Sequence, residues 1–388
     1  MRAHSERRLA DVGIGCVQPA LCGYRLPKSG AERGHDVRLQ RQRERVFGVG
    51  LFVPTSGSLG IWGPSTIACA QLAADEINRA GGLLGLEVRL RIVDSADEVA
   101  GLARKTSQML ADWEIDAIVG MHTSAVRQRL LGAVAGRVPY VYTPLYEGGE
   151  RTSGVYAIGE TPQQQLRPAI HALAAQRRIR RWALVGNDYV WPRASHALAR
   201  RYVEETGGAV LDDLYLPLGV CDFAPVVDRL SRLNVDALLL SLVGQDAVGF
   251  NREFGAAPAS VRAMLRLSCA IEENGLLAIG AENTEELYVS AGYFAGLQTD
   301  ANMAFRERYY SLFGDRAPSL NTIGQSTYEG VHFLASLVST QRHGEGAAPV
   351  PLAYRSVRGA VYVDNDLKTC PMYLARADGH LLEVVRRL

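Results

Sequence analysis

Several signatures of common function classes are missing from this 388-residue sequence. Its six cysteines form no C-x-x-C pair and have no histidine cluster beside them, which argues against a zinc site or a disulfide framework. We expect these cysteines to be buried, reduced thiols. No apolar run approaches the roughly 20 residues that a membrane helix needs. The net charge is only +1, so charge gives no indication of nucleic acid or a membrane surface as partner.

Enzyme motifs are absent too. The sequence contains no G-x-S-x-G elbow, P-loop or H-E-x-x-H, and GVGLFVPTSG does not place a G-x-G-x-x-G where a dinucleotide would need it. Ser124 and His122 are close in sequence, but no acid completes a triad in a matching context. These observations favour a binding protein without a cofactor or a metal. An enzyme of unknown class is the less favoured alternative.

The first 45 residues differ from the rest of the chain. Residues 1–45 hold ten basic residues against five acidic ones, and their Gly/Pro-broken pattern supplies no helix-turn-helix. They also lack the apolar segment of a signal peptide. We interpret 1–45 as a basic leader that is disordered or follows a wrongly assigned start. The sequence as written predicts a cytoplasmic protein; a different true start would predict a periplasmic or lipid-anchored extracellular one.

From Val46 onward the chain alternates strands and helices, which predicts an α/β fold with parallel sheets. The length suits two domains of about 150 residues each. Strands are expected at 46–53, 86–94, 116–120, 138–142, 154–159, 181–186, 209–218, 235–244, 261–268 and 286–294. Helices are expected at 64–82, 96–113, 123–135, 163–178, 192–206, 224–233 and 245–254, with a Gly/Ser loop at 54–60.

The last third breaks this alternation. Residues 300–314 and 324–341 read as two consecutive helices, and 344–349 read as a linker. Strand-like pieces follow at 357–364 and 371–377, with NDLK (365–368) as the turn between them, before the final HLLEVVRRL. This ending predicts a chain that crosses between two domains and closes with a small antiparallel ribbon.

Five ordered motifs carry a family resemblance. The stretch from Pro54 to Asp94 has a P-x-(T/S)-G loop, a helix ending in E-x-I-N-x-x-G-G-x-x-G and a strand ending in Asp. VGMHTS, YTPLYEG and GNDYVWPR follow in order. Residues 46–388 resemble type I periplasmic-binding proteins of the branched-chain amino-acid/amide/urea class, and look most similar to the amide/urea branch that includes a cytoplasmic amidase regulator. Thr143, Pro144 and His122 depart from that branch.

The resemblance implies two Rossmann-like lobes with parallel sheets, joined by three crossovers around a Venus-flytrap cleft. Lobe 1 would comprise about 46–160 plus 296–345, and lobe 2 about 161–295 plus 346–388. Tyr293 and Phe294 match a hinge position. The resemblance also implies a non-catalytic receptor that closes on a small ligand.

The predicted site lies where parallel strands end, because ligands of open α/β sheets bind at that edge. Ser124 is expected at a helix start, where it contacts an oxygen of the ligand or only caps the helix. His122 and Thr123 precede it, and His122 is either a ligand contact or a structural histidine. The next strand leads into three more candidate contacts: Tyr142, Thr143 and Tyr146. Glu147 is expected to fix the turn of this loop rather than to contact the ligand.

Across the cleft, Tyr189 is expected to close over the ligand, and Trp191 either walls the pocket or packs between lobes. Asp188 is expected to hold its loop. Gly244 with Gln245, and residues 268–272, are weaker candidates. Trp62 is a candidate lid. An amino-acid ligand would need a carboxylate for its ammonium, and Asp188, Asp246 and Glu272 are the acids in place for that.

Tyrosines, serine and histidine suit a neutral amide or urea-like ligand better than a free amino acid. We therefore expect a receptor for a short-chain amide, a urea-like compound or an amino acid; a branched-chain amino-acid receptor is the alternative. The expected partner is an ABC permease or a cytoplasmic regulatory protein, with no nucleic acid bound. The sequence leaves open whether the receptor is a monomer or a homodimer.

Overall fold

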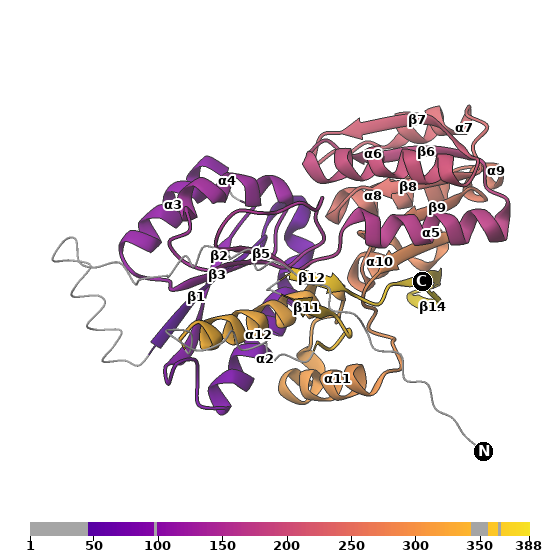
Figure 1. Ribbon diagram of the computed structural model, residues 1–388. Coiled ribbons are helices and arrows are strands. Elements are labelled where there is room, and N and C mark those ends of the chain that lie inside the picture. The colour runs from indigo at the N-terminus through magenta and orange to yellow at the C-terminus, as the bar shows by residue number, and fades with distance from the viewer. Residues whose placement is uncertain (1–45, 97–98, 343–355, 364–365) are drawn as a thin grey trace, which may run out of the picture.

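The protein folds into two α/β lobes that face each other across a cavity (Figure 1). The computed structural model describes residues 46–96, 99–342, 356–363 and 366–388. The predicted leader (1–45) and linker (344–349) lie outside the described residues. The predicted fold class is confirmed.

Lobe 1 is built on a parallel five-stranded sheet of order β2-β1-β3-β4-β5. Helices α2 and α12 pack together on one face, and α3 and α4 on the other (Figure 1). Both faces are covered, so the interior strand β1 is buried and apolar along its whole length. The elements are β1 (Val46–Val53), η1 (Gly57–Trp62), α2 (Gly63–Arg79), β2 (Glu87–Asp94), α3 (Val99–Ala111), β3 (Ala117–Gly120), α4 (Ser124–Val134), β4 (Tyr140–Tyr142), β5 (Val155–Ala157), α11 (Asp300–Phe313), η3 (Gly314–Arg316) and α12 (Thr322–Arg342).

Lobe 2 is built on a seven-stranded sheet of order β14-β13-β10-β9-β8-β6-β7. Five strands are parallel, and β13 and β14 join antiparallel at one edge. The elements are α5 (Pro162–Arg177), β6 (Arg181–Asn187), α6 (Val190–Glu205), β7 (Ala209–Leu216), α7 (Ala224–Ser231), β8 (Ala237–Ser241), α8 (Gly244–Ala256), α9 (Ala259–Arg262), β9 (Leu265–Ser268), α10 (Glu273–Ile279), η2 (Ala281–Asn283), β10 (Leu287–Ala291), β13 (Tyr373–Asp378) and β14 (Leu381–Arg387).

The chain passes between the lobes after β5, after β10 and before β13. Before its last passage it forms a hairpin of β11 (Val361–Val363) and β12 (Asp366–Thr369). Arg358 and Tyr362 contact α12 of lobe 1 near this hairpin. The lobe boundaries stay a prediction, and these contacts lead us to propose that the third passage lies near Cys370.

Four local predictions were wrong. Residues 366–368 of the expected NDLK turn belong instead to strand β12 (Asp366–Thr369), which pairs with β11, and Asn365 lies outside the described residues. The strand expected at 261–268 begins only at Leu265, because α9 extends to Arg262. The Gly/Ser loop contains the 3₁₀ helix η1, and helix α10 was missed.

In the part of the chain that the structure describes, no helix combines the length and apolarity needed to cross a membrane.

Candidate ligand-binding site

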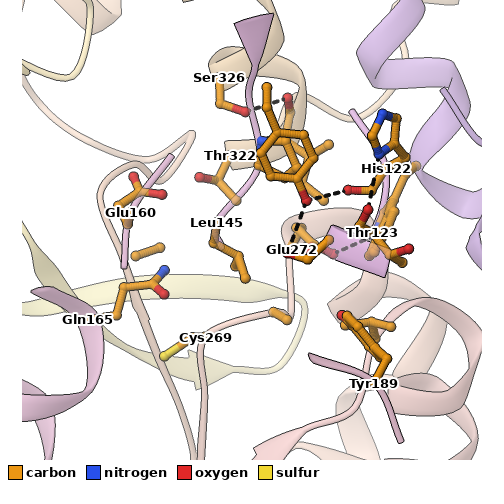
Figure 2. A pocket seen from close by; sticks show the side chains of 18 residues that line it. His122, Thr123, Leu145, Glu160, Gln165, Tyr189, Cys269, Glu272, Thr322 and Ser326 are labelled. Carbon is orange, nitrogen blue, oxygen red and sulfur yellow. Dashed lines mark hydrogen bonds between the residues drawn. The ribbon is translucent and has the colours of Figure 1, made fainter. Parts of the chain in front are cut away.

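A cavity of about 40 Å³ lies between the lobes at the carboxyl ends of both parallel sheets (Figure 2). A water molecule needs roughly 10–15 Å³ by this measure, so the space suits a small molecule only. Lobe 1, lobe 2 and the first crossover all contribute walls. The lining residues are Trp62, His122, Thr123, Ser124, Tyr142, Pro144, Leu145, Glu160, Gln165, Tyr189, Val243, Cys269, Ala270, Glu272, Ala291, Thr322, Ile323 and Ser326.

The N-terminus of α4 forms one end of this cavity. Thr123, not Ser124, is the N-cap, and its Oγ1 accepts from the N–H of Val126 at 3.4 Å. The hydroxyl of Ser124 has one long contact, 3.5 Å to that of Tyr142. Ser124 is therefore free to bond a ligand oxygen, and the first N–H groups of the helix favour partial negative charge there.

His122 lines the cavity, but its ring is already hydrogen-bonded. Nδ1 lies 3.1 Å from the carbonyl oxygen of Thr123, and Nε2 lies 2.9 Å from the hydroxyl of Tyr140. Nδ1 carries the proton in this arrangement, because a carbonyl only accepts. Burial lowers the pKa of His122 to about 4, so the ring is neutral. Its role is to fix the loop rather than to supply charge.

The loop YTPLYEGGE is anchored by a buried arginine. Arg127 of α4 is paired with Glu147 and Glu150, and its guanidinium lies 5.0 Å from the ring centroid of Tyr142 and 5.3 Å from that of Tyr146. Glu147 and Glu150 hold the loop onto α4, and Glu147 lies outside the cavity lining. Tyr142 is thereby fixed with its hydroxyl donating to the carbonyl of His122 at 2.7 Å.

On the opposite wall, Glu272 is a buried carboxyl group without an ion-pair partner among the described residues. It accepts one hydrogen bond, from Nε1 of Trp62 in lobe 1 at 3.3 Å. Burial raises the pKa of Glu272 to about 8. The group is therefore largely neutral at neutral pH. Tyr189 lines the same wall at the start of α6.

Four predicted contact residues lie outside the lining. Thr143 packs against Gly330 of α12. The contact is so close that a Cβ added to Gly330 would lie 2.3 Å from Cγ2 of Thr143. The ring of Tyr146 packs edge-on against that of Tyr142, with 6.4 Å between centroids, and Trp191 packs tilted against Tyr189, with 6.3 Å between centroids. Gly244 contacts lobe 1 instead, and its neighbour Val243 lines the cavity.

Of the three acids considered for an ammonium group, only Glu272 lines the cavity. Asp246 accepts from Ser58, Asn187 and the N–H of Gly219, which leaves it fully engaged. Asp188 is exposed and holds Arg193 at 2.7 Å, as its loop role predicted. In the described ranges no group of three or more His, Cys, Asp or Glu side chains is arranged to hold a metal ion.

Glu160 and Gln165 line the other end of the cavity, and no sequence motif pointed to them. Glu160 lies in the first crossover, and Gln165 lies in the first turn of α5. Figure 2 shows both side chains at the end opposite Glu272 and Tyr189, with Leu145 between the two ends. The cavity is therefore elongated and polar at both ends.

Comparison with known proteins places this geometry in a family. The sequence model of the family described as periplasmic binding protein matches residues 47–366. The Leu/Ile/Val-binding protein BraC3 of Rhizobium johnstonii is 27% identical over 196 residues, which cover 49% of this chain and 53% of that protein. The chain thus spans about half the length of the curated relative it matches.

Solved structures share the fold. LivJ of Streptococcus pneumoniae, solved with isoleucine, has a TM-score of 0.71 and 18% identity, and the match covers 88% of this chain and all of LivJ. A solute-binding protein of Rhodopseudomonas palustris, solved with p-hydroxybenzoic acid, has a TM-score of 0.78 and 18% identity, covering 88% and 97% of the two chains. The chain belongs to the periplasmic binding protein family, whose model matches most of its length.

Proposed function

We propose that the protein is the receptor of an ABC importer and closes on a small neutral ligand with an amide or urea-like group. One observation carries the ligand class: no Lys or Arg side chain lines the cavity of the described structure, and its unpaired carboxyl, Glu272, is largely neutral at neutral pH. A neutral polar ligand requires no charged partner, whereas a buried unpaired ion is costly.

Hydrogen bonding in the cavity supports the same class. The carbonyl oxygen of an amide fits the hydroxyl of Ser124 and the N-terminus of α4. Its N–H groups fit the acceptor oxygens of Tyr142, Tyr189 or Glu272 on the facing walls. Trp62 covers this end and reaches lobe 2 only when the lobes are closed.

A free amino acid is the second candidate, because Glu272 is placed to pair an ammonium group once such a ligand enters. The Leu/Ile/Val-binding name of one relative and the isoleucine bound to LivJ are consistent with it. Family membership also supports action outside the cytoplasm together with a membrane permease, and we extend the proposal to that role.

A thermal-shift screen of the full chain against short amides, alkyl ureas and branched-chain amino acids tests the proposal. A ligand at 100 times its Kd adds about 2.7 kcal/mol of stability. We expect shifts with amides or ureas that are lost in Ser124→Ala. Shifts with amino acids alone would move the function to the second candidate.

A further inference from the structure

We call the cavity end formed by Glu160 and Gln165 the hinge end. It has no role in holding an amide head group at α4. Gln165 has a side chain only 1% exposed, yet its Oε1 has no hydrogen-bond partner. A buried amide oxygen without a partner costs stability, so such groups are usually satisfied. Gln165 lines the cavity and is one of the labelled side chains at this end (Figure 2).

Glu160 supplies a second acceptor beside it. Arg358 holds Oε1 of Glu160. The same oxygen lies against Gly292 of the second crossover, so that a Cβ added to Gly292 would lie 2.3 Å from it. None of the described residues donates a hydrogen bond to Oε2 of Glu160. The carboxylate is therefore fixed from behind by the crossovers while its second oxygen remains available.

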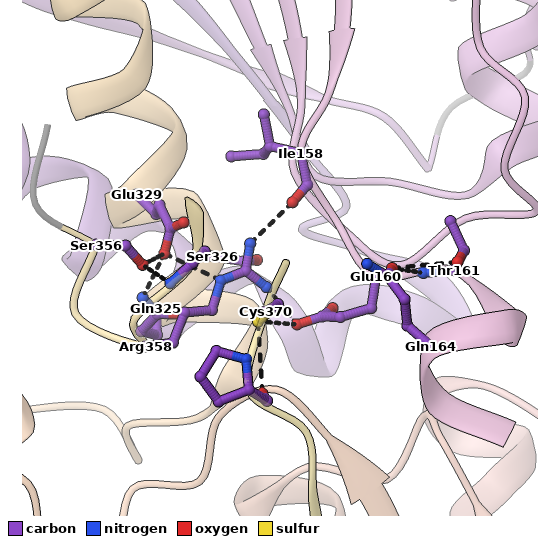
Figure 3. A network of polar contacts seen from close by, with 12 residues as sticks. Ile158, Glu160, Thr161, Gln164, Gln325, Ser326, Glu329, Ser356, Arg358 and Cys370 are labelled. Atoms are coloured by element: carbon purple, nitrogen blue, oxygen red, sulfur yellow. Dashed lines mark hydrogen bonds and ion pairs between the residues drawn. The ribbon is translucent and has the colours of Figure 1, made fainter. Parts of the chain in front are cut away.

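The charge balance behind this end favours a donor. Arg358 is shared between Glu160 and Glu329, and all three side chains are buried (Figure 3). Two carboxylates against one guanidinium leave a negative excess near the cavity. Such a site attracts N–H or O–H groups and repels a carboxylate.

We propose that Glu160 and Gln165 form a second recognition subsite that binds a hydrogen-bond donor, a hydroxyl or an amino group, at the far end of the ligand. The ligand is then a short bifunctional chain: its carbonyl end meets α4 and its donor end meets Gln165. Gln165 becomes a specificity-determining residue that disfavours a purely aliphatic tail. This inference rests on the proposed function for the position of the head group.

Matched probes test the subsite separately from the head group. Butanamide is compared with 4-hydroxybutanamide and 4-aminobutanamide, and norvaline with 5-hydroxynorvaline and ornithine, by calorimetric Kd measurements on the full chain. Within a pair the donor-bearing probe is expected to bind about five- to tenfold more tightly. A preference seen only among the amino acids keeps the subsite and overturns the amide head group. Equal or tighter binding of the aliphatic probe overturns the subsite.

The variant Gln165→Met removes the amide at nearly constant shape, and Gln163→Met makes the same change at an exposed position of α5. We expect Gln165→Met to abolish the preference within each pair and Gln163→Met to keep it. Melting of the ligand-free proteins gives a readout that needs no probe to bind. A Tm at or above that of Gln163→Met supports a ligand-binding amide, whereas a Tm several degrees lower assigns Gln165 a structural role and overturns the proposal.

Discussion

The two sides of the cavity are closed by different kinds of interaction. At the mouth, lobe 1 meets lobe 2 through single hydrogen bonds: Ser58–Asp246, Trp62–Glu272, Ile61–Asn274 and Asn274–Asn321, which we call the mouth contacts. At the hinge, Arg358 joins Glu160 and Glu329, and Tyr362 and Ser356 donate to Glu329; this is the hinge network (Figure 3).

The difference indicates which side opens. The hinge network is made of buried ion pairs, and breaking one costs several kcal/mol because a bare charge is left behind. Each mouth contact involves at most one ionisable group and contributes about 0.5–1.5 kcal/mol net. Opening that breaks the mouth contacts therefore costs much less than opening that breaks the hinge network, and a ligand bound between the lobes adds to the mouth contacts in favour of the closed form. We infer that the lobes open and close by hinge bending with the network intact.

The largest effect is expected from Arg358→Met. Arg358 is buried, and its removal leaves Glu160 and Glu329 without a counter-charge. We expect a loss of about 3–5 kcal/mol in the free energy of unfolding, measured by urea denaturation. Arg376→Met is the matched control, since that arginine is half-exposed and pairs with Glu286, and it should cost less than about 1 kcal/mol. Similar losses in both variants would contradict the role given to the hinge network.

The next effect is expected at the mouth from Gly244→Ala. Gly244 has φ +57°, and a Cβ there would lie 2.5 Å from the carbonyl oxygen of Ser58 in the other lobe. Such overpacking opposes closure by about 1–3 kcal/mol, or roughly five- to 150-fold weaker ligand binding.

Gly57→Ala separates backbone strain from the lobe contact. Gly57 has a similar φ of +63°, but nothing lies within 4 Å of the position of an added Cβ. Its ligand affinity should stay near that of the wild type, although both variants bear the cost of a left-handed alanine. If the two variants bind equally, Gly244 is not where the lobes meet in the closed form.

A pH series is expected to give an intermediate effect. Burial raises the pKa of Glu272 from 4.5 to about 8, and that of the adjacent Glu273 to about 7. The closed form therefore binds more protons than an opened form that exposes these groups to water, and closure weakens as pH rises from 5 to 8. A neutral ligand should lose more than tenfold in affinity across that range.

The same series distinguishes the two ligand classes. An ammonium group requires the charged carboxylate, so the affinity for an amino acid should not fall between pH 5 and 8. Glu272→Gln removes the titrating group, and it should abolish most of the pH dependence of the affinity for a neutral ligand. Circular dichroism at each pH confirms that the chain remains folded.

The sequence predicted the strands well and the cavity lining only in part, for physical reasons. A buried strand such as Val46–Val53 is apolar throughout, so its pattern needs no tertiary information. Ser124 and Tyr189 were found because they follow strand ends. The sequence could not show that Tyr142 lines the cavity while Thr143 and Tyr146 do not. Neighbouring residues of a loop point in different directions, and which of them faces the cavity depends on the conformation that the loop adopts.

The residues of the hinge end show a different limit. Glu160 is held at the cavity by Gly292 and Arg358, which the crossovers bring beside it at sequence separations of more than 120 residues. The segment NDLK has the composition of a turn, but pairing with β11 makes most of it a strand. Local composition is overridden in both places by contacts distant in sequence.

The smallest effect is expected from Ser58→Ala, which removes a single mouth contact. The Ser58 hydroxyl donates to Asp246 at 2.7 Å, but Asp246 keeps its bonds from Asn187 at 2.7 Å and from the N–H of Gly219 at 2.8 Å. The Asp246 carboxylate stays hydrogen-bonded through Oδ2, so we expect ligand affinity to fall only about three- to fivefold, with unfolding little changed. Ser231→Ala, at an exposed serine of α7, should leave affinity unaltered. A hundredfold loss in Ser58→Ala would show that one mouth contact dominates closure, and the mouth would then resemble the hinge in strength.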